Sequence, residues 1–158
     1  MHTEHSFEII WSAEAEVPFV GLWCHNCSKY LEVREYPANS LVFYIASPLS
    51  AATPAEVSAN MEKAKTYQQE VARMMMEDFP EETVHTYAPH ATLPLELDDS
   101  DPASRKAAME FDLEVLRHCA GLVVCGPTIS AGMQEEIDFA KENKIAVWRY
   151  NGNSIFAF

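Results

Sequence analysis

Two acidic residues lie on the apolar stripes of two predicted helices. Glu136 falls on the inner stripe of the predicted helix 130–143, next to Glu135 on the solvent face, and Asp112 falls on the stripe of the predicted helix 102–118. The apolar residues of these stripes are Met133, Ile137 and Ala140 in the later helix and Ala108, Phe111, Val115, Leu116 and Cys119 in the earlier one. A buried carboxylate costs several kcal/mol unless it is paired or hydrogen-bonded. Each acid therefore either caps or bridges at the edge of its stripe, or is kept there for nucleophilic and acid–base chemistry.

A turn over residues 126–132 precedes the later of these helices. Ser130 stands at the N-cap position, and the N–H groups that follow it, together with its hydroxyl, suit a phosphate or another hydrogen-bonding anion. Gly132 and Met133 continue the turn into the helix. The turn is neither a Walker loop nor a GxGxxG motif, so a plain helix cap and an anion-binding turn both remain open.

Three further polar residues are candidates for binding a ligand. Ser47 follows the first strand of the predicted sheet, His90 follows the second, and Arg105 lies one turn into the helix 102–118. A lone histidine is more often structural, whereas Arg105 is placed to meet either a ligand phosphate or the acidic cluster at 98–101. Helix capping and solvation explain that cluster better than a bound cation does.

Four cysteines are present, and two of them form the motif Cys24-His25-Asn26-Cys27. Cys24 and Cys27 have the spacing of a metal knuckle, but a zinc site needs four ligands and no second CxxC or HxxxH motif occurs. His2 and His5, or a second copy of the chain, could complete the set. An unmetallated turn is the favoured interpretation, and no cofactor is expected. Redox chemistry is disfavoured because the βαβ context of such motifs is missing.

The elements that must position these residues alternate between strand and helix from residue 41 onward. This alternation predicts a doubly wound, flavodoxin- or Rossmann-like α/β fold with a mainly parallel sheet of about five strands and flanking helices. The predicted strands are 41–46, 83–88, 121–125, 145–150 and 154–158, and the predicted helices are 55–78, 102–118 and 130–143. Before them, short aromatic and β-branched segments predict a small antiparallel β unit; they are 7–11, 17–24 and 29–36.

We expect two parts, a β extension with the CxxC turn over residues 1–36 and an α/β domain over residues 41–158. Ligands of doubly wound sheets bind outside the carboxyl ends of the strands, where the strand order reverses. This rule selects three loops that carry the candidate residues; they are 44–54, 88–101 and 126–132.

The charge of the chain narrows its partners. Among 158 residues, 11 Lys and Arg stand against 24 Asp and Glu, which gives a formal net charge of −13. A nucleic-acid polymer needs a basic footprint, so only small nucleosides or nucleotides remain as ligands of that kind.

No apolar run approaches the ~20 residues of a membrane span, and the first residues lack the layout of a signal peptide. A cytoplasmic protein without a membrane partner is expected.

Several of these pieces, in their order and spacing, resemble the nucleoside 2-deoxyribosyltransferase superfamily, which includes the 2′-deoxynucleoside 5′-monophosphate N-glycosidases. The resemblance covers about residues 41–150 and is strongest to an uncharacterised branch found in phages and bacteria. It implies a homo-oligomer whose subunits complete one another's pockets. The pieces are Phe43-Tyr44-Ile45-Ala46-Ser47-Pro48, Ala88-Pro89-His90, Asp112, and the run from Ile129 to Ala140 with its pattern Ser-x-Gly-Met-x-x-Glu-Ile.

The resemblance implies a role for each matching position. Glu136 matches the nucleophilic glutamate, Asp112 the aspartate that assists departure of the base, and Tyr44 the tyrosine that helps to hold the nucleophile. The residues that match substrate-binding segments are Ser47, His90, Ser130, Gly132 and Met133. The loop after the first strand lacks the glycines common in the nucleotide hydrolases, which leaves the need for a 5′-phosphate open.

The leading hypothesis is therefore an N-glycoside hydrolase or a nucleoside deoxyribosyltransferase. It would cleave or transfer the N-glycosidic bond of a (deoxy)nucleoside or its 5′-monophosphate through a glycosyl intermediate on Glu136. The alternative is a non-catalytic module that senses or sequesters a nucleotide. A third possibility is an interaction protein that uses residues 1–36 as its contact surface. Release of free base, as against binding of an unchanged ligand, separates the first two.

Overall fold

The computed structural model describes residues 6–49, 52–89 and 101–158. By internal contacts the chain divides into two compact units, which are Met1–Ala38 with Leu93–Val115 and Asn39–Thr92 with Leu116–Phe158. The first, N-terminal unit thus also contains most of the helix predicted at 102–118. The division into domains at 1–36 and 41–158 stays a prediction.

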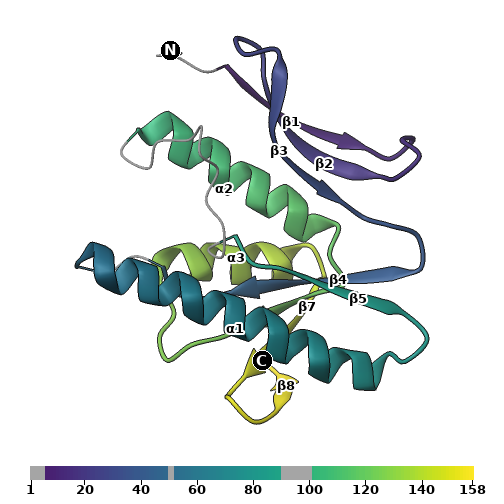
Figure 1. Cartoon of the computed structure of the whole chain (residues 1–158), viewed down its shortest axis with the longest axis vertical. Helices are drawn as coiled ribbons and strands as arrows, with labels where there is room; N and C mark the ends of the chain where they lie inside the picture. The colour runs from purple at the N-terminus through teal and green to yellow at the C-terminus, as the bar shows by residue number, and fades with distance from the viewer. Residues whose placement is uncertain (1–5, 50–51, 90–100) are drawn as a thin grey trace. The chain divides into compact units, whose positions relative to one another are not determined.

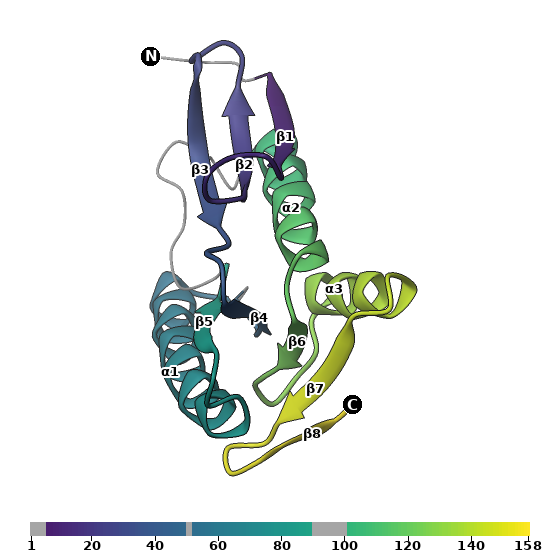
Figure 2. The same ribbon diagram turned by 90° about the vertical axis from the view of Figure 1, so that its right-hand side faces the viewer.

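The N-terminal unit contains a three-stranded antiparallel sheet in the order β1-β2-β3, as predicted (Figure 1 and Figure 2). Its strands are β1 (Phe7–Ser12), β2 (Phe19–Cys24) and β3 (Lys29–Glu35). Alternate β2 residues, Val20, Leu22 and Cys24, are completely buried. On the other face, Gly21 leaves room for an aromatic ring, because a Cβ there would lie 2.5 Å from Cε1 of Tyr30. The period of two along β2 therefore separates an apolar face from a face covered by aromatic side chains.

The helix α2 (Pro102–Arg117) begins at the predicted cap. Oδ1 of Asp101 accepts a hydrogen bond from the Ala103 amide at 3.3 Å, which stabilises the first turn. The stripe prediction is wrong in one respect, because Ala107 is buried and Ala108 is only half-buried. The other four predicted stripe residues, Phe111, Val115, Leu116 and Cys119, are buried, and Asp112 is half-buried. The buried residues of α2 are Ser104, Ala107, Phe111, Val115 and Leu116.

The second unit contains a five-stranded sheet in the order β5-β4-β6-β7-β8, with β8 antiparallel to β7 and the other neighbours parallel. This confirms the predicted α/β fold. The strands are β4 (Ser40–Ala46), β5 (Thr83–Tyr87), β6 (Gly121–Val124), β7 (Ala146–Tyr150) and β8 (Ile155–Ala157). Helix α1 (Pro54–Asp78) leads from β4 to β5, and α3 (Ala131–Glu142) leads from β6 to β7 in the opposite direction. Right-handed crossovers in opposite directions place α1 and α3 on opposite faces and reverse the strand order between β4 and β6.

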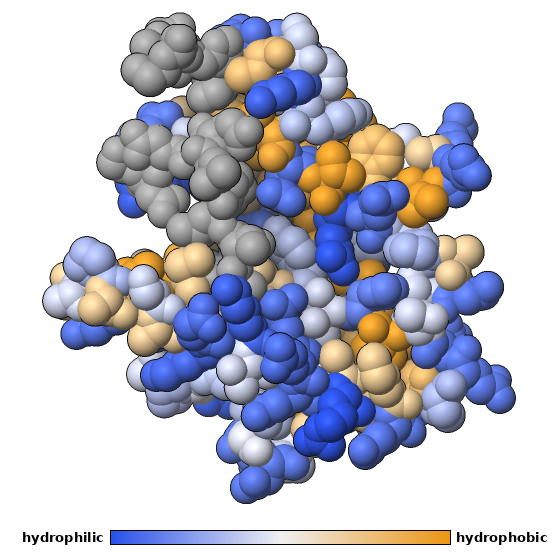
Figure 3. All heavy atoms as spheres, in the orientation of Figure 1, coloured by the Kyte–Doolittle hydropathy of each residue, from blue (hydrophilic) through white to orange (hydrophobic). Residues whose placement is uncertain are grey.

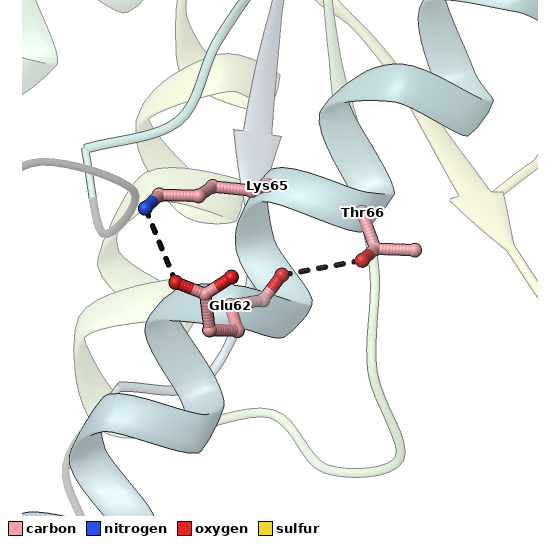
Figure 4. Close-up of polar contacts among 3 residues, drawn as sticks. All are labelled: Glu62, Lys65 and Thr66. Atoms are coloured by element: carbon pink, nitrogen blue, oxygen red, sulfur yellow. Dashed lines mark hydrogen bonds and ion pairs between the residues drawn. The ribbon is translucent and has the colours of Figure 1, made fainter.

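Helix α1 covers one face of this sheet with its apolar side. The helix residues Ala64, Val71 and Met75 form one buried cluster with the sheet residues Phe43, Ile45, Val84, Ala88, Val123, Cys125 and Tyr150. The outward side is mostly hydrophilic, as Figure 3 shows. There, Nζ of Lys65 lies 3.2 Å from Oε1 of Glu62, and Oγ1 of Thr66 donates to the Glu62 carbonyl oxygen (Figure 4). Such exposed contacts contribute little, so burial of the apolar side anchors the helix. Among the described residues, no helix has the length and apolar character needed to cross a membrane.

Candidate functional site

Glu136 is a buried carboxylic acid on the inner side of α3. Its exposed fraction is 3 %, and it lies on the stripe of Met133 and Ile137, which are each 1 % exposed. Glu135 is exposed, so the predicted orientation of this helix is confirmed. Because α3 follows directly on β6, its first half, which includes Glu136, lies toward the carboxyl edge of the parallel strands. The structure therefore keeps an acid inside an apolar helix side at the edge where such sheets bind ligands.

Tyr44 is a buried residue of β4, on the face of the sheet that α3 covers. Its neighbours Phe43 and Ile45 pack against α1, so the period of two turns Tyr44 toward the face that α3 covers (Figure 2). Tyr44 is completely buried, and its ring centroid lies 5.5 Å from that of Tyr87, its partner in the β4–β5 register. Two predicted site residues thus lie at the same face of the sheet, Tyr44 on β4 and Glu136 on the helix α3 that covers this face.

Ser130 caps α3, as predicted. Its Oγ accepts a hydrogen bond from the Met133 amide at 3.2 Å, and its own amide donates to Sδ of Met133 at 3.5 Å. Met133 is buried, so it holds the cap from inside. Gly132 belongs to the first turn, whose amides have no partner within a helix. The cap is in place, and the first turn is the part of α3 that suits an anion.

Ser47 is a buried hydroxyl at the end of β4. It is 1 % exposed, and its Oγ has no hydrogen-bond partner among the residues that the structure describes. The preceding carbonyl oxygen, that of Ala46, accepts a hydrogen bond from the Cys125 amide at 2.8 Å. Ser47 therefore lies beside the start of the β6–α3 loop. Leaving a buried hydroxyl unpaired costs about 1–3 kcal/mol, so this position is suited to a polar ligand atom.

The loops after β4 and β6 contact each other at Gly126. Its φ is +95°, and a Cβ at this position would lie only 2.8 Å from Cδ of Pro48. The guanidinium of Arg149, on β7, donates to the Gly126 carbonyl oxygen at 2.6 Å. Arg149 is not among the residues predicted from the sequence, because nothing near it along the chain reveals a partner 23 residues away. These contacts set the path of the chain into α3.

A second group of polar side chains lies at the carboxyl edge of the parallel strands, on the face of the sheet that α1 covers. The hydroxyl of Tyr150 donates to the carboxylate of Glu70 on α1 and lies 3.1 Å from the Gly152 carbonyl oxygen. Burial, and then the bond to Glu70, raise the pKa of Tyr150 to about 12. Burial also raises the pKa of the Cys125 thiol to about 12, although the charge of Arg149 acts the other way. Both groups are therefore protonated at neutral pH, and Cys125 is unsuited to act as a thiolate nucleophile.

The variant Tyr150→Phe is expected to lose about 2 kcal/mol of unfolding free energy at neutral pH, because a hydrogen bond to a carboxylate is removed. The folded-state pKa of Tyr150, about 12, exceeds its ordinary value of 10.0. The folded state thus binds this proton more tightly, so the contribution is complete below about pH 10 and is lost as the pH rises toward about 12. Urea unfolding across this pH range measures the effect.

The unfolding free energy of Tyr150→Phe should decline less steeply with rising pH than that of the wild type. Tyr30→Phe, at an exposed position, should match the wild type. Equal declines for all three proteins would contradict the assignment.

The remaining predicted site residues are divided between the units. Asp112 and Arg105 belong to the N-terminal unit, whereas Glu136 belongs to the second unit. Convergence of Asp112 and Glu136 on one cavity stays a prediction. Arg105 is exposed, and His90 lies outside the described residues. No group of three or more His, Cys, Asp or Glu side chains that could hold a metal ion occurs within 6–49, 52–89 and 101–158.

Comparison with known proteins gives one family and one solved structure. Residues 41–150 match the family described as Domain of unknown function (DUF7768). No curated protein matches the chain. A solved structure of a 2-deoxyribosyltransferase from the psychrotolerant bacterium Bacillus psychrosaccharolyticus is similar over 68 % of this chain and 70 % of that chain. The sequence identity is 14 % and the TM-score is 0.48.

Proposed function

The chain belongs to the family described as Domain of unknown function (DUF7768), and for this member we propose cleavage or transfer at the N-glycosidic bond of a deoxynucleoside or its 5′-monophosphate. The observation that carries the proposal is the burial of Glu136 on the inner side of α3. A buried carboxylate at this edge of the sheet is a suitable nucleophile for a positively charged sugar carbon. The motif resemblance of residues 41–150 supports the same role.

In the first step, a carboxylate oxygen of Glu136 attacks the anomeric carbon of the sugar. The bond from that carbon to the base nitrogen breaks, and its electron pair leaves with the base. Asp112 gives its proton to the departing base, which requires that its carboxyl group be protonated before the step. The product is a glycosyl ester on Glu136. The charge that develops on the sugar in the transition state is stabilised by the same carboxylate.

In the second step, a water molecule or a second base attacks the anomeric carbon. The bond to Glu136 breaks, and the ionised Asp112 takes the proton of the attacking group. Water gives free deoxyribose or its 5′-phosphate, and a second base gives a new nucleoside or its 5′-monophosphate. Two inversions at one carbon give net retention of configuration in both cases.

Other residues of the second unit would position the substrate. Tyr44 lies on the face of Glu136, where its hydroxyl would orient the nucleophile. The first turn of α3, with Ser130 and Gly132, would bind the 5′ end of the sugar. The Ser47 hydroxyl, buried and without a partner among the described residues, would bond to a sugar hydroxyl or a phosphate oxygen. Each of these roles depends on the proposed reaction.

The experiment is a panel of the four deoxynucleosides and their 5′-monophosphates, each incubated with the full chain. Free base is separated by chromatography, and a second base is added in parallel samples to detect transfer. We expect base release or exchange for at least one substrate, and a faster reaction of monophosphates would indicate a phosphate contact. Binding by calorimetry without any base release would identify a nucleotide-binding module instead. No binding and no release would refute the proposal.

A further inference from the structure

Three aromatic rings form a row along β2, on the face of the three-stranded sheet opposite the buried side chains of that strand. Phe19 and Trp23 lie on either side of Gly21, and the ring of Tyr30, on β3, lies against Gly21 between them. The ring centroid of Tyr30 lies 5.5 Å from that of Phe19 and 4.8 Å from that of Trp23, with interplanar angles of 89° and 75°. Phe19 and Trp23 are half-buried, and Tyr30 is exposed. The row therefore presents at the surface rings whose planes stand nearly perpendicular from one ring to the next.

Exposed carboxylates share this face at both ends of the row. In the registers of the sheet, Glu8 of β1 is the partner of Trp23, and Glu35 of β3 is the partner of Phe19. Cross-strand partners project to the same face of a sheet, so each acid lies beside a ring. Both acids are exposed, and Oε2 of Glu8 lies 2.9 Å from Nε2 of His25. We call this surface the aromatic face, and it consists of Phe19, Trp23, Tyr30, Glu8 and Glu35.

The lysine and the arginine of the three strands lie on the opposite face. Lys29 is the partner of Cys24, and Arg34 is the partner of Val20. The side chains of Cys24 and Val20 are completely buried on the other side of the sheet. The aromatic face therefore carries carboxylates, whereas Lys29 and Arg34 project away from it. The formal net charge of the whole chain, −13, acts in the same sense.

Aromatic rings and carboxylates in this arrangement favour a cationic ligand. The face of an aromatic ring is negative and attracts a cation that lies over it within about 6 Å of the ring centroid. A guanidinium group suits such a surface best, because it is planar and weakly hydrated, stacks on rings and forms paired hydrogen bonds with a carboxylate. Nucleic acids and the surfaces of membranes are anionic and would be repelled. A second copy of the chain would bring one acidic face against another.

We propose that the aromatic face docks an extended, arginine-containing segment of a partner protein. Phe19 and Trp23 are four residues apart on one strand, so about 13 Å separates the two ends of the row. Two arginines four residues apart in an extended segment span the same distance, and each would meet one ring and one carboxylate. The aromatic face lies outside the residues that match the family, 41–150, so this proposal is independent of the proposed catalysis.

Calorimetric titration of the full chain with a synthetic peptide tests the proposal. The probe is a short glycine-rich peptide with two arginines four residues apart, and the same peptide with two glutamates is the charge control. We expect the arginine peptide to bind and the glutamate peptide not to bind. Tyr30→Leu keeps apolar bulk but removes the ring, so it should weaken binding at least about fivefold, and Glu35→Gln should weaken it about threefold. The matched controls at exposed positions of the second unit, Phe156→Leu and Glu135→Gln, should bind as the wild type does.

Three results would overturn the proposal. The first is a wild type that does not bind the arginine peptide. The second is Tyr30→Leu and Glu35→Gln binding as tightly as the wild type, because the peptide would then be held only by the overall negative charge of the chain. The third is a dimer in sedimentation equilibrium that Tyr30→Leu abolishes, because a second copy would then cover the face. Glu35→Gln changes an exposed side chain, so it decides the matter even if Tyr30→Leu fails to fold.

Discussion

Replacing Glu136 with glutamine is expected to lower the rate of base release by at least about 10³-fold, because the amide cannot form the glycosyl ester. Glutamine has nearly the same volume as glutamate, so the packing of α3 beside Met133 and Ile137 should persist. The measurement is initial-rate chromatography of free base with the best substrate of the panel.

Glu135→Gln is the matched control for this prediction. It makes the same chemical change one residue earlier on the same helix, at an exposed position. Its activity should equal that of the wild type. If Glu136→Gln keeps the activity of Glu135→Gln, Glu136 is not the nucleophile, and the buried acid has a structural role instead. If both variants lose activity, the effect comes from the charge of α3 and not from one reacting group.

Replacing Gly126 with alanine is expected to cost about 3 kcal/mol of unfolding free energy, from a disfavoured φ and from an overpacked contact. The φ of +95° disfavours any side chain, and the new Cβ would meet Cδ of Pro48 at 2.8 Å. Relief of this clash would also shift the loop that leads to the cap of α3. A loss of activity should therefore accompany the loss of stability. Urea unfolding and the base-release assay measure the two effects.

Gly152→Ala separates the two causes. Its φ is +98°, almost the same as that of Gly126, but no atom lies within 4 Å of the added Cβ. This variant should lose only about 1 kcal/mol and keep full activity. The difference in unfolding free energy between the two variants measures the cost of the clash between the loops that follow β4 and β6. Equal losses would mean that Pro48 moves aside without cost and that the loops are not tightly packed.

The sequence was informative where residues close together along the chain interact. Ser130 caps α3 through an amide three residues later, and Asp101 caps α2 through an amide two residues later. The burial of Glu136 follows from the period of 3.6 residues per turn, which places it beside Met133 and Ile137. Among the predicted stripe residues of the two helices, only Ala108 is not buried, and its neighbour Ala107 is buried instead.

Contacts between distant segments were not predictable in the same way. Arg149 is hydrogen-bonded to Gly126, and Tyr150 is hydrogen-bonded to Glu70. The partners are far apart along the chain, so no helical or strand periodicity in the sequence links them. The hydrogen bond between the Ser6 carbonyl oxygen and the His25 amide depends on the register of β1 against β2, and shifting that register by one residue would turn every side chain to the other face. Such pairings result from the packing of the whole unit.

By itself, the sequence determined the kind of fold, the helix caps and the acidic residue on the inner side of α3, because these follow from local periodicity and turn chemistry. The tertiary structure alone decided that Tyr44 and Glu136 share one face, that Ser47 is buried at the edge of the same sheet, and that the start of β1 meets the Cys24–Cys27 turn. The physical reason is that strand order and register arise from long-range packing, which no short window of residues specifies.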